Sequence, residues 1–173
     1  MSRTYRNIIK TKQCERFYNL SPRIYIYDLD GTIIDSSYRA IINGDGTIDL
    51  DIWKARNSRE WIFTDTLLPL YYKLQQDYKN GDMVILCTAR EMNKYDYEFI
   101  HFHNIYYDRI ISRPKGNNTA DHILKASQCR YLFNLPQYRD LEKFFIDDNE
   151  RNLSALKELG ATVLNAKHWK QIA

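Results

Sequence analysis

Two carboxylates one residue apart stand near the start of the chain, directly after a run of β-branched and aromatic residues. That run, 24–27, is followed by Asp28 and Asp30, and then by Gly31 and Thr32. Side chains one residue apart normally face opposite sides of a strand, but a glycine-permitted loop at the strand end lets both carboxylates reach one site. Their repulsion favours a bound cation, and Mg²⁺ is the usual choice for oxygen ligands. A carboxylate beside Mg²⁺ can attack phosphorus and form an aspartyl-phosphate; the alternative is a solvated Asp-Gly turn.

A hydroxyl and a guanidinium follow the next apolar run. Residues 83–87 are continuously apolar, which indicates a strand buried on both faces, and Thr88 and Arg90 come directly after it. Together these two side chains can hold two oxygens of one phosphoryl group. Thr88 can equally cap the following helix, because Glu91 stands three residues later at the spacing of a capping box. The two roles are compatible.

A second acidic pair and a lysine come from the C-terminal half of the chain. The apolar run 143–146 ends at Asp147 and Asp148. Lys125 stands four residues after Asp121 on a helix expected from about residue 119, and this i,i+4 pairing can orient its ammonium. A solvated surface position is the alternative for Lys125. Its place between the third and fourth expected strands favours a role at the site.

Alternating strands and helices must position these groups. Strands are expected at 23–27, 83–87, 109–112, 143–146 and 161–164, and helices at 57–79, 91–103, from about 119, and 149–159. This alternation is typical of an α/β fold with a parallel sheet. Ligands of such sheets bind beyond the carboxyl ends of the strands, and right-handed crossovers allow all four polar segments to converge there. The spacing therefore predicts a Mg²⁺-dependent phosphoryl-transfer site.

Length, charge and cysteine content limit the class of protein. The 173 residues suffice for one α/β domain with a sizeable core. The net charge of +3 suits an anionic substrate without identifying nucleic acid. Three cysteines without CxxC spacing argue against a disulfide framework or a zinc site. Without an apolar run of about 18 residues or a signal-peptide core, the expected location is cytoplasmic and not membrane-bound.

The chain divides into a basic N-terminal extension and one domain. Residues 1–22 carry five cations and one acid, so they are either a basic arm that touches a polyanion or a short packed extension. Residues 23–173 form the expected domain. Within it, residues 33–56 are a candidate small cap or hairpin insertion, because Asn43-Gly44 and Asp45-Gly46 favour a turn.

The order of the polar motifs resembles one enzyme superfamily. Asp28 to Thr32, Thr88 after its apolar strand, Lys125, and the Asp147-Asp148 pair are similar to the motifs of haloacid dehalogenase (HAD) superfamily phosphatases over roughly residues 23–166. Within that superfamily the chain is most similar to the phosphatase domain of phage-type polynucleotide kinase–3′-phosphatases. The resemblance implies a three-layer Rossmann-like sandwich with a central parallel sheet and no large cap domain.

The resemblance also implies roles for individual residues. Asp28 would be the nucleophile, and Asp30 the general acid and then the general base. Thr88 and Lys125 would hold the phosphoryl oxygens, and Asp148 would hold a metal-bound water or Lys125. The implied Mg²⁺ ligands are Asp28, Asp30 through its backbone carbonyl, Asp147 and Asp148.

The expected activity is Mg²⁺-dependent phosphomonoester hydrolysis through an aspartyl-phosphate. Removal of 3′-phosphates from nucleic-acid ends is the favoured reaction, and a 5′/3′-nucleotidase acting on free (deoxy)nucleotides is the alternative. A non-catalytic nucleic-acid-binding module on the same scaffold is the third hypothesis. Arg90, Arg39 and Arg113 are the candidate contacts to substrate phosphates. For a chain of phage origin the expected location is the host cytoplasm.

Overall fold

A parallel five-stranded sheet forms the centre of the computed structural model, which describes residues 16–169. The strand order is β5-β4-β1-β6-β7, and every neighbouring pair is parallel. The strands are β1 (Ile24–Tyr27), β4 (Met83–Cys87), β5 (Arg109–Ile111), β6 (Lys143–Asp147) and β7 (Thr162–Asn165). All five expected strands are therefore confirmed, with ends shifted by one residue at most.

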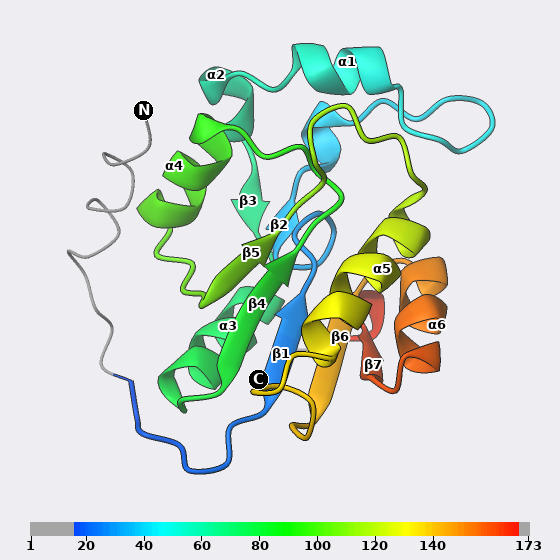
Figure 1. Ribbon diagram of the computed structural model, residues 1–173. Coiled ribbons are helices and arrows are strands. Elements are labelled where there is room, and N and C mark those ends of the chain that lie inside the picture. Colours follow the sequence, from blue (N-terminus) through cyan, green and yellow to red (C-terminus); the bar gives the residue numbers. More distant parts are fainter. Residues whose placement is uncertain (1–15, 170–173) are drawn as a thin grey trace.

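Alternate residues of the central strands pack into two separate cores, one on each face of the sheet. Tyr27 and Leu86 belong to one core, which is completed by α3 (Leu70–Lys79) and α4 (Lys94–Phe102). Ile26 and Ile85 belong to the other, which is completed by α5 (Asp121–Phe133) and α6 (Glu150–Glu158). Figure 1 shows these helix pairs on opposite sides of the sheet. Burial on both faces explains the unbroken apolar runs, and the predicted three-layer α/β fold is confirmed.

The segment between β1 and β4 is built from short elements. β2 (Ile34–Asp35) pairs antiparallel with β3 (Thr66–Leu67). Between them lie the 3₁₀ helix η2 (Ser37–Arg39), α1 (Leu50–Ala55) and α2 (Arg59–Ile62). The single helix expected over 57–79 is wrong, because α2 ends at Ile62 and β3 intervenes before α3 begins. Figure 1 places α1 and α2 beyond the carboxyl ends of the strands.

The expected turn at residues 43–46 is present in this segment. The Asn43 amide donates to the Thr47 carbonyl at 2.7 Å, Gly46 has a φ of +83°, and Ile42 bridges Ile48 antiparallel. The absence of a large cap domain is confirmed for residues 16–169. Whether residues 33–56 act as a small cap stays a prediction.

Helix capping differs from the expectation at one helix. α4 begins at Lys94, and its capping box pairs Asn93 with Asp96. A capping box of Thr88 with Glu91 is therefore wrong, because two further residues, Met92 and Asn93, separate Glu91 from the helix. α6 is capped by Asn149, whose side chain accepts from the Arg151 amide, as the sequence indicated.

Residues 16–22 pack along the amino ends of the strands. The Arg16 guanidinium donates to the Asp108 carboxylate at 2.6 and 2.9 Å and also to the Asp82 carbonyl. Gly81, with a φ of +84°, leaves room for the Phe17 carbonyl, which a side chain there would strike. Phe17, Tyr18 and Leu20 are nevertheless exposed, so both hypotheses for the extension stay predictions, and residues 1–15 lie outside the described residues. No helix among residues 16–169 is long and apolar enough to span a membrane.

Candidate active site

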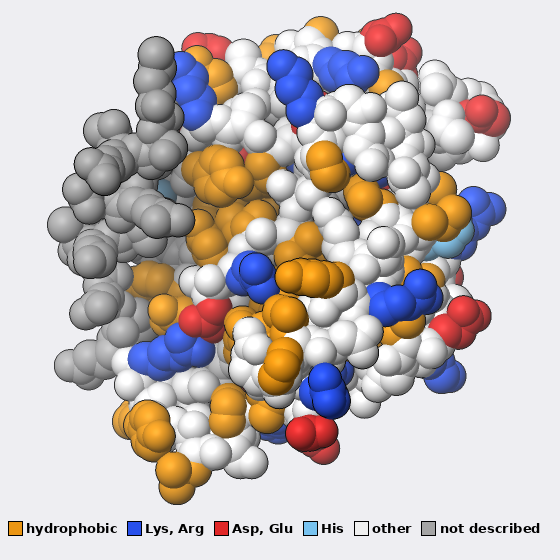
Figure 2. Space-filling view, viewed as in Figure 1, with side chains coloured by type: hydrophobic (Ala, Val, Ile, Leu, Met, Phe, Trp, Pro, Cys, Tyr) orange, Lys and Arg blue, Asp and Glu red, His pale blue; other side chains and the backbone are white. Residues whose placement is uncertain are grey.

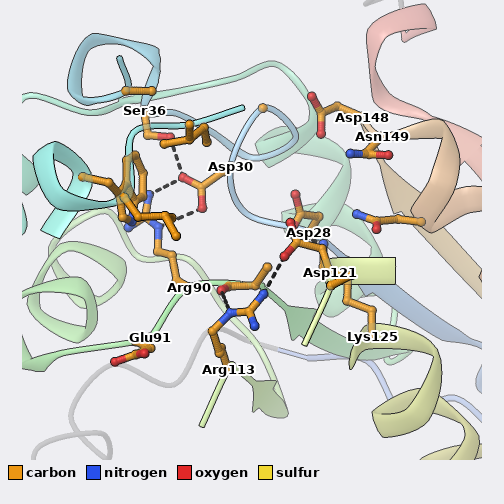
Figure 3. A pocket seen from close by; sticks show the side chains of 18 of the residues that line it. Asp28, Asp30, Ser36, Arg90, Glu91, Arg113, Asp121, Lys125, Asp148 and Asn149 are labelled. Atoms are coloured by element: carbon orange, nitrogen blue, oxygen red, sulfur yellow. Dashed lines mark hydrogen bonds and ion pairs between the residues drawn. The ribbon is translucent and has the colours of Figure 1, made fainter. Parts of the chain in front are cut away.

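A buried lysine joins the first and fourth of the predicted motifs. Asp28 follows β1 and Asp147 ends β6, so adjacent parallel strands deliver both carboxylates to the same edge of the sheet. Lys125 comes from the second turn of α5. Its Nζ donates to Asp28 Oδ1 at 2.6 Å and to Asp147 Oδ2 at 2.7 Å, and the side chain is almost fully buried. Figure 3 shows Asp28 and Lys125 at the pocket.

The pairing expected between Asp121 and Lys125 is wrong. Asp121 instead accepts a hydrogen bond from Arg113, while Lys125 turns inward to Asp28 and Asp147. An i,i+4 contact on a helix surface contributes only about 0.2–0.5 kcal/mol. Two buried carboxylates attract the ammonium more strongly, because little water screens them.

Burial and the interactions among the charged groups shift the pKa values of Asp28 and Lys125. Burial raises the pKa of Asp28 well above its ordinary value; Lys125 opposes that effect, while Asp147 and Asp30 add to it. Burial tends to lower the pKa of Lys125, but the charges of Asp28 and Asp147 outweigh it, and the net pKa is raised. Lys125 is therefore an ammonium, and one positive charge does not balance the acids around it.

Three carboxylates at the centre fit a divalent cation. Asp28, Asp147 and Asp148 each offer one oxygen, and these atoms all lie within 4.8 Å of one another. Oxygen donors of this kind are the preferred ligands of Mg²⁺. Three carboxylates facing one buried ammonium leave an excess of negative charge that such an ion would offset. The side chain of Asp30 is outside this cluster, so its predicted part in metal binding can only use the backbone carbonyl.

Gly31 lets the β1 loop pass close to Asp148. Its φ is +74°, a backbone conformation that costs glycine little. A Cβ built at this position would lie 2.7 Å from Asp148 Oδ2 and 2.9 Å from Cγ. Gly31 is therefore required both by the turn and by the approach of a carboxylate that belongs to the acidic cluster.

Asn152 is a site residue that the sequence reasoning missed. Its Nδ2 donates to both oxygens of Asp147, at 3.1 and 3.0 Å, and the Asn149 amide donates to Asp147 Oδ1 at 2.9 Å. The Oδ1 atom of Asn152 is buried and has no hydrogen-bond partner within residues 16–169. Its position in the sequence is the signal that could have indicated it. Asn152 lies in the first turn of the helix that follows Asp147, on the side that faces back toward the strand end.

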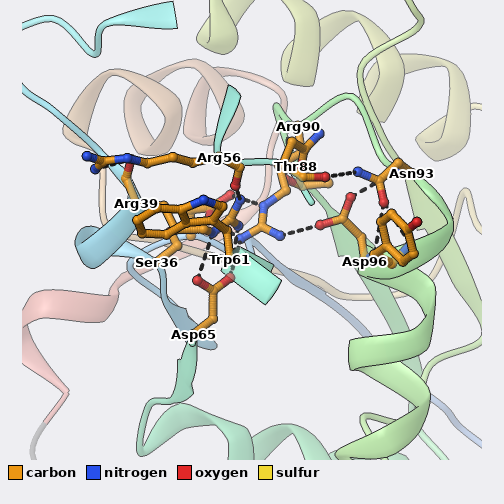
Figure 4. Close-up of polar contacts among 12 residues, drawn as sticks. Ser36, Arg39, Arg56, Trp61, Asp65, Thr88, Arg90, Asn93 and Asp96 are labelled. Atoms are coloured by element: carbon orange, nitrogen blue, oxygen red, sulfur yellow. Dashed lines mark hydrogen bonds and ion pairs between the residues drawn. The ribbon is translucent and has the colours of Figure 1, made fainter. Parts of the chain in front are cut away.

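A second charged cluster holds Asp30. The Arg90 guanidinium donates to Asp65 and Asp96 (Figure 4). It also donates to Asp30, and Ser36 Oγ donates to Asp30 Oδ1 (Figure 3). Burial raises the pKa of Asp30, but the charge and hydrogen bonds of Arg90, helped by Ser36, outweigh burial and lower it overall. Asp30 is thus an ionised carboxylate next to the acidic cluster of Asp28, Asp147 and Asp148. Arg90 lines the pocket, but its donors are engaged by these carboxylates.

Arg39 does not line the pocket, and the prediction that it contacts a substrate phosphate is wrong. The side chain is fully buried, and its guanidinium donates to Asp65 at 2.8 and 2.9 Å and to the Arg56 carbonyl at 3.1 Å. A buried cation needs a paired acid, and Asp65 supplies that charge. Arg39 therefore supports the wall of the pocket from behind.

Arg113 lines the pocket, whereas Thr88 is buried beside it and does not line it, and the polar atoms of both are largely engaged. Arg113 lines the pocket and holds the loop that follows β5 by donating to the carbonyls of Ala89, Asn117 and Thr119. Thr88 is fully buried, and its Oγ1 accepts from the Arg90 amide at 3.1 Å. Phosphoryl contacts by either residue stay predictions.

One pocket of about 680 Å³ is lined by seven of these residues: Asp28, Asp30, Arg90, Arg113, Lys125, Asp148 and Asn152. It is within the size range of small-molecule sites. The strand ends and α5 supply the acids and Lys125 at its base. Its walls come from residues 35–57 on one side and from the loop 113–121 on another.

Comparison with solved structures defines the class of protein. A haloacid dehalogenase-like hydrolase from Streptococcus pneumoniae is 15% identical, with a TM-score of 0.60 and coverage of 85% of each chain. A chain of the Pnkp1/Rnl/Hen1 RNA repair complex is 22% identical, with a TM-score of 0.60 over 89% of this chain. This chain spans about half of that longer one, 46%. The fold is that of the HAD-superfamily hydrolases.

Comparison of sequences defines the family. The sequence profile of the bacteriophage T5 5′-deoxynucleotidase family matches residues 15–172, and the chain belongs to that family. It is 31% identical over 180 residues to the 5′-deoxynucleotidase of Escherichia phage T5, covering 93% of this chain and 73% of that protein. The predicted HAD resemblance is confirmed, and the nearer likeness is to a nucleotidase.

Proposed function

We propose that this enzyme hydrolyses the phosphomonoester of free deoxynucleoside 5′-monophosphates. The observation that carries the proposal is the buried contact of Lys125 with Asp28 and Asp147, within a chain of the 5′-deoxynucleotidase family. The proposal adopts the nucleotidase alternative of the sequence analysis and makes 3′-phosphorylated nucleic-acid ends the competing substrate.

The reaction proceeds in two displacements. Asp28 attacks phosphorus, the bond from phosphorus to the ester oxygen breaks, and Asp30 gives its proton to the departing alcohol. A water that loses a proton to Asp30 then attacks the aspartyl-phosphate, releasing inorganic phosphate and restoring Asp28. Arg90 and Ser36 keep Asp30 ionised and ready for the second step. The phosphoryl dianion raises the proton affinity of Asp30 for the first step, because like charges disfavour ionisation.

Positive charge must offset the phosphoryl oxygens in both steps. Lys125 supplies an ammonium at the attacking carboxylate, the kind of preorganised charge that stabilises a transition state. Mg²⁺ held by Asp28, Asp147, Asp148 and the Asp30 carbonyl would supply the remaining charge and orient the phosphoryl group. Asn152 and the Asn149 amide fix the orientation of Asp147 for that purpose.

The charges of the pocket support a small substrate over a polynucleotide. The ionisable lining residues are six acids and four cations: Asp28, Asp30, Asp35, Glu91, Asp121 and Asp148, with Lys54, Arg90, Arg113 and Lys125. Of those cations only Lys54 has no ion pair with residues 16–169. Figure 2 shows lysine and arginine atoms scattered over one face of the molecule and not gathered in a band. A polynucleotide strand is normally bound along a basic groove.

A phosphate-release panel with Mg²⁺ tests the proposal. The substrates are the four deoxynucleoside 5′-monophosphates, the matching 3′-monophosphates, and a short oligonucleotide with a 3′-phosphate. We expect kcat/KM for the 5′-monophosphates to exceed that for the oligonucleotide by about 100-fold, and Asp28→Asn to abolish release from all of them. A higher kcat/KM for the 3′-phosphorylated oligonucleotide would overturn the substrate assignment. Full activity in Asp28→Asn would overturn the mechanism.

A further inference from the structure

We infer that Ile48, Leu50 and Trp53 form a nucleobase subsite, in which the base stacks on the Trp53 indole while the phosphate lies at Asp28. The inference rests on the proposed function and adds where the enzyme recognises the base. These three residues are called the apolar wall. They follow the 43–46 turn and continue into α1, and all three line the pocket that contains Asp28 and Lys125.

The apolar wall leaves hydrophobic side chains uncovered at an otherwise polar site. Ile48 is 42% exposed and Leu50 60% exposed, and Trp53 is half-buried. The rest of the lining is mostly charged residues, amides and hydroxyls. An apolar surface that remains exposed in a pocket is a recognised mark of a binding site. A ligand that fits both parts is anionic at one end and flat and apolar at the other, as a nucleotide is.

Buried charges hold the indole in a fixed position relative to the phosphate end. The Arg39 guanidinium lies 4.5 Å from the Trp53 ring centroid, and the Arg90 guanidinium lies 5.6 Å from it. Arg39 is anchored by Asp65, and Arg90 binds Asp30, two residues from the nucleophile. Cations held against an indole stabilise its orientation. The ring is thus set in place before any substrate arrives, which lowers the entropic cost of binding.

Stacking on an indole favours a nucleotide over a sugar phosphate that carries no base. It discriminates little among the four bases. Every base has an aromatic face, so contact of this kind tolerates all four. We therefore expect KM values for the four deoxynucleoside 5′-monophosphates to lie within a few-fold of one another. A large preference for one base would contradict recognition through the apolar wall.

The decisive measurement is a selectivity ratio, kcat/KM for deoxythymidine 5′-monophosphate divided by kcat/KM for deoxyribose 5-phosphate, which carries no base. For Trp53→Ala we expect this ratio to fall roughly tenfold or more, with Trp53→Phe retaining most of it. Trp61→Ala is the matched control, because Trp61 contacts Arg56 at 4.8 Å and does not line the pocket. Its ratio should equal that of the wild type.

The outcomes separate the possible failures. If Trp53 only supports Arg39 and Arg90, Trp53→Ala lowers both kcat/KM values equally, the ratio is unchanged, and the subsite is overturned. If the wild type hydrolyses no 5′-monophosphate, the proposed function fails first. Should Trp53→Ala not fold, Trp53→Phe in the Asp28→Asn background provides the test through tryptophan fluorescence. In that double variant, binding of the nucleotide should no longer quench tryptophan emission. Trp61→Phe in the same background should retain the quench. Equal quenching in both variants would overturn the subsite.

Discussion

Lys125 is the side chain on which the charge balance of the site depends. Its ammonium lies 2.6 Å from Asp28 and 2.7 Å from Asp147, and all three side chains are buried. Without that cation two acids would face each other with little water between them. One of them would then tend to keep a proton, since like charges in a dry site cannot both ionise at low cost. A protonated Asp28 is a poor nucleophile.

Lys125→Met tests this dependence, because methionine keeps an unbranched apolar stem without the charge. We expect kcat to fall about 100- to 1,000-fold, the usual effect of removing one preorganised donor. Lys125→Arg, which keeps a positive charge in a larger group, should retain more activity than Lys125→Met. Steady-state kinetics with a saturating nucleotide measures both. Equal kcat for Lys125→Met and the wild type would contradict a role in the chemical step.

Asn152 makes a separate prediction at the same scale. In Asn152→Ala, Asp147 loses both Nδ2 hydrogen bonds and keeps only those from Lys125 and the Asn149 amide, so its orientation in the acidic cluster is held less firmly. Groups that orient metal ligands typically contribute about 10- to 100-fold to metal affinity or activity. We expect the Mg²⁺ concentration for half-maximal activity to rise by that factor. Asn134→Ala, which removes an exposed contact to the Arg130 carbonyl and lies outside the pocket lining, is the control, and its Mg²⁺ requirement should not change.

At the scale of elements, a buried ion pair joins the segment between β1 and β4 to the central sheet. Arg39, in η2, binds Asp65, which stands between α2 and β3, and Arg90 after β4 contacts the same carboxylate. These contacts therefore link η2, which follows β2, and the residue before β3 to the carboxyl end of β4. Removing Arg39 leaves the buried Asp65 carboxylate with only its 3.3 Å contact to Arg90, so part of its charge is no longer compensated.

Arg39→Met should lower the free energy of unfolding by about 3 kcal/mol, the low end of the cost of breaking a buried ion pair, because Arg90 still contacts Asp65. Combining it with Asp65→Asn should recover part of that loss, because the orphaned charge is then removed. Chemical denaturation measures both. The control is Arg59→Ala, whose exposed pair with Glu98 should contribute about 0–1 kcal/mol. Equal effects of Arg39→Met and Arg59→Ala would show that the buried pair contributes nothing special.

The sequence predicted elements best where a local pattern determines them. The run 83–87 is apolar throughout because β4 is covered on both faces, so its identity could be predicted from composition alone. The failures involve distant partners. Lys125 turns inward because Asp28, 97 positions away, lies there, and no spacing within α5 shows that. Arg39 is buried for the same reason, since its acid comes from another element.

At the scale of the whole molecule, the distribution of charge sets how the enzyme responds to salt. The net charge is only +3, and most cations at the pocket are already paired with acids. A mononucleotide brings one phosphoryl group and releases few counterions. A strand held along its backbone releases many more.

We therefore expect kcat/KM for a deoxynucleoside 5′-monophosphate to change less than about threefold between 50 and 200 mM salt, whereas 6–10 phosphate contacts would cost about 10³–10⁵. Stopped assays at constant free Mg²⁺ over that range measure the slope of log(kcat/KM) against log salt concentration. A slope steep enough to imply several phosphate contacts would contradict a mononucleotide site and favour nucleic-acid ends. The 3′-phosphorylated oligonucleotide is the comparison substrate in the same buffers.

The clamp of Arg16 on Asp108 and Asp82 has a practical consequence. Both acids precede strands whose opposite ends open into the pocket, so residue 16 is anchored at the amino-end edge of the sheet, opposite the acidic cluster. A purification tag, fluorophore or surface tether joined directly to residue 16 would therefore start at the edge opposite the mouth of the pocket. Immobilised enzyme attached this way should turn over substrate at the rate of the free protein.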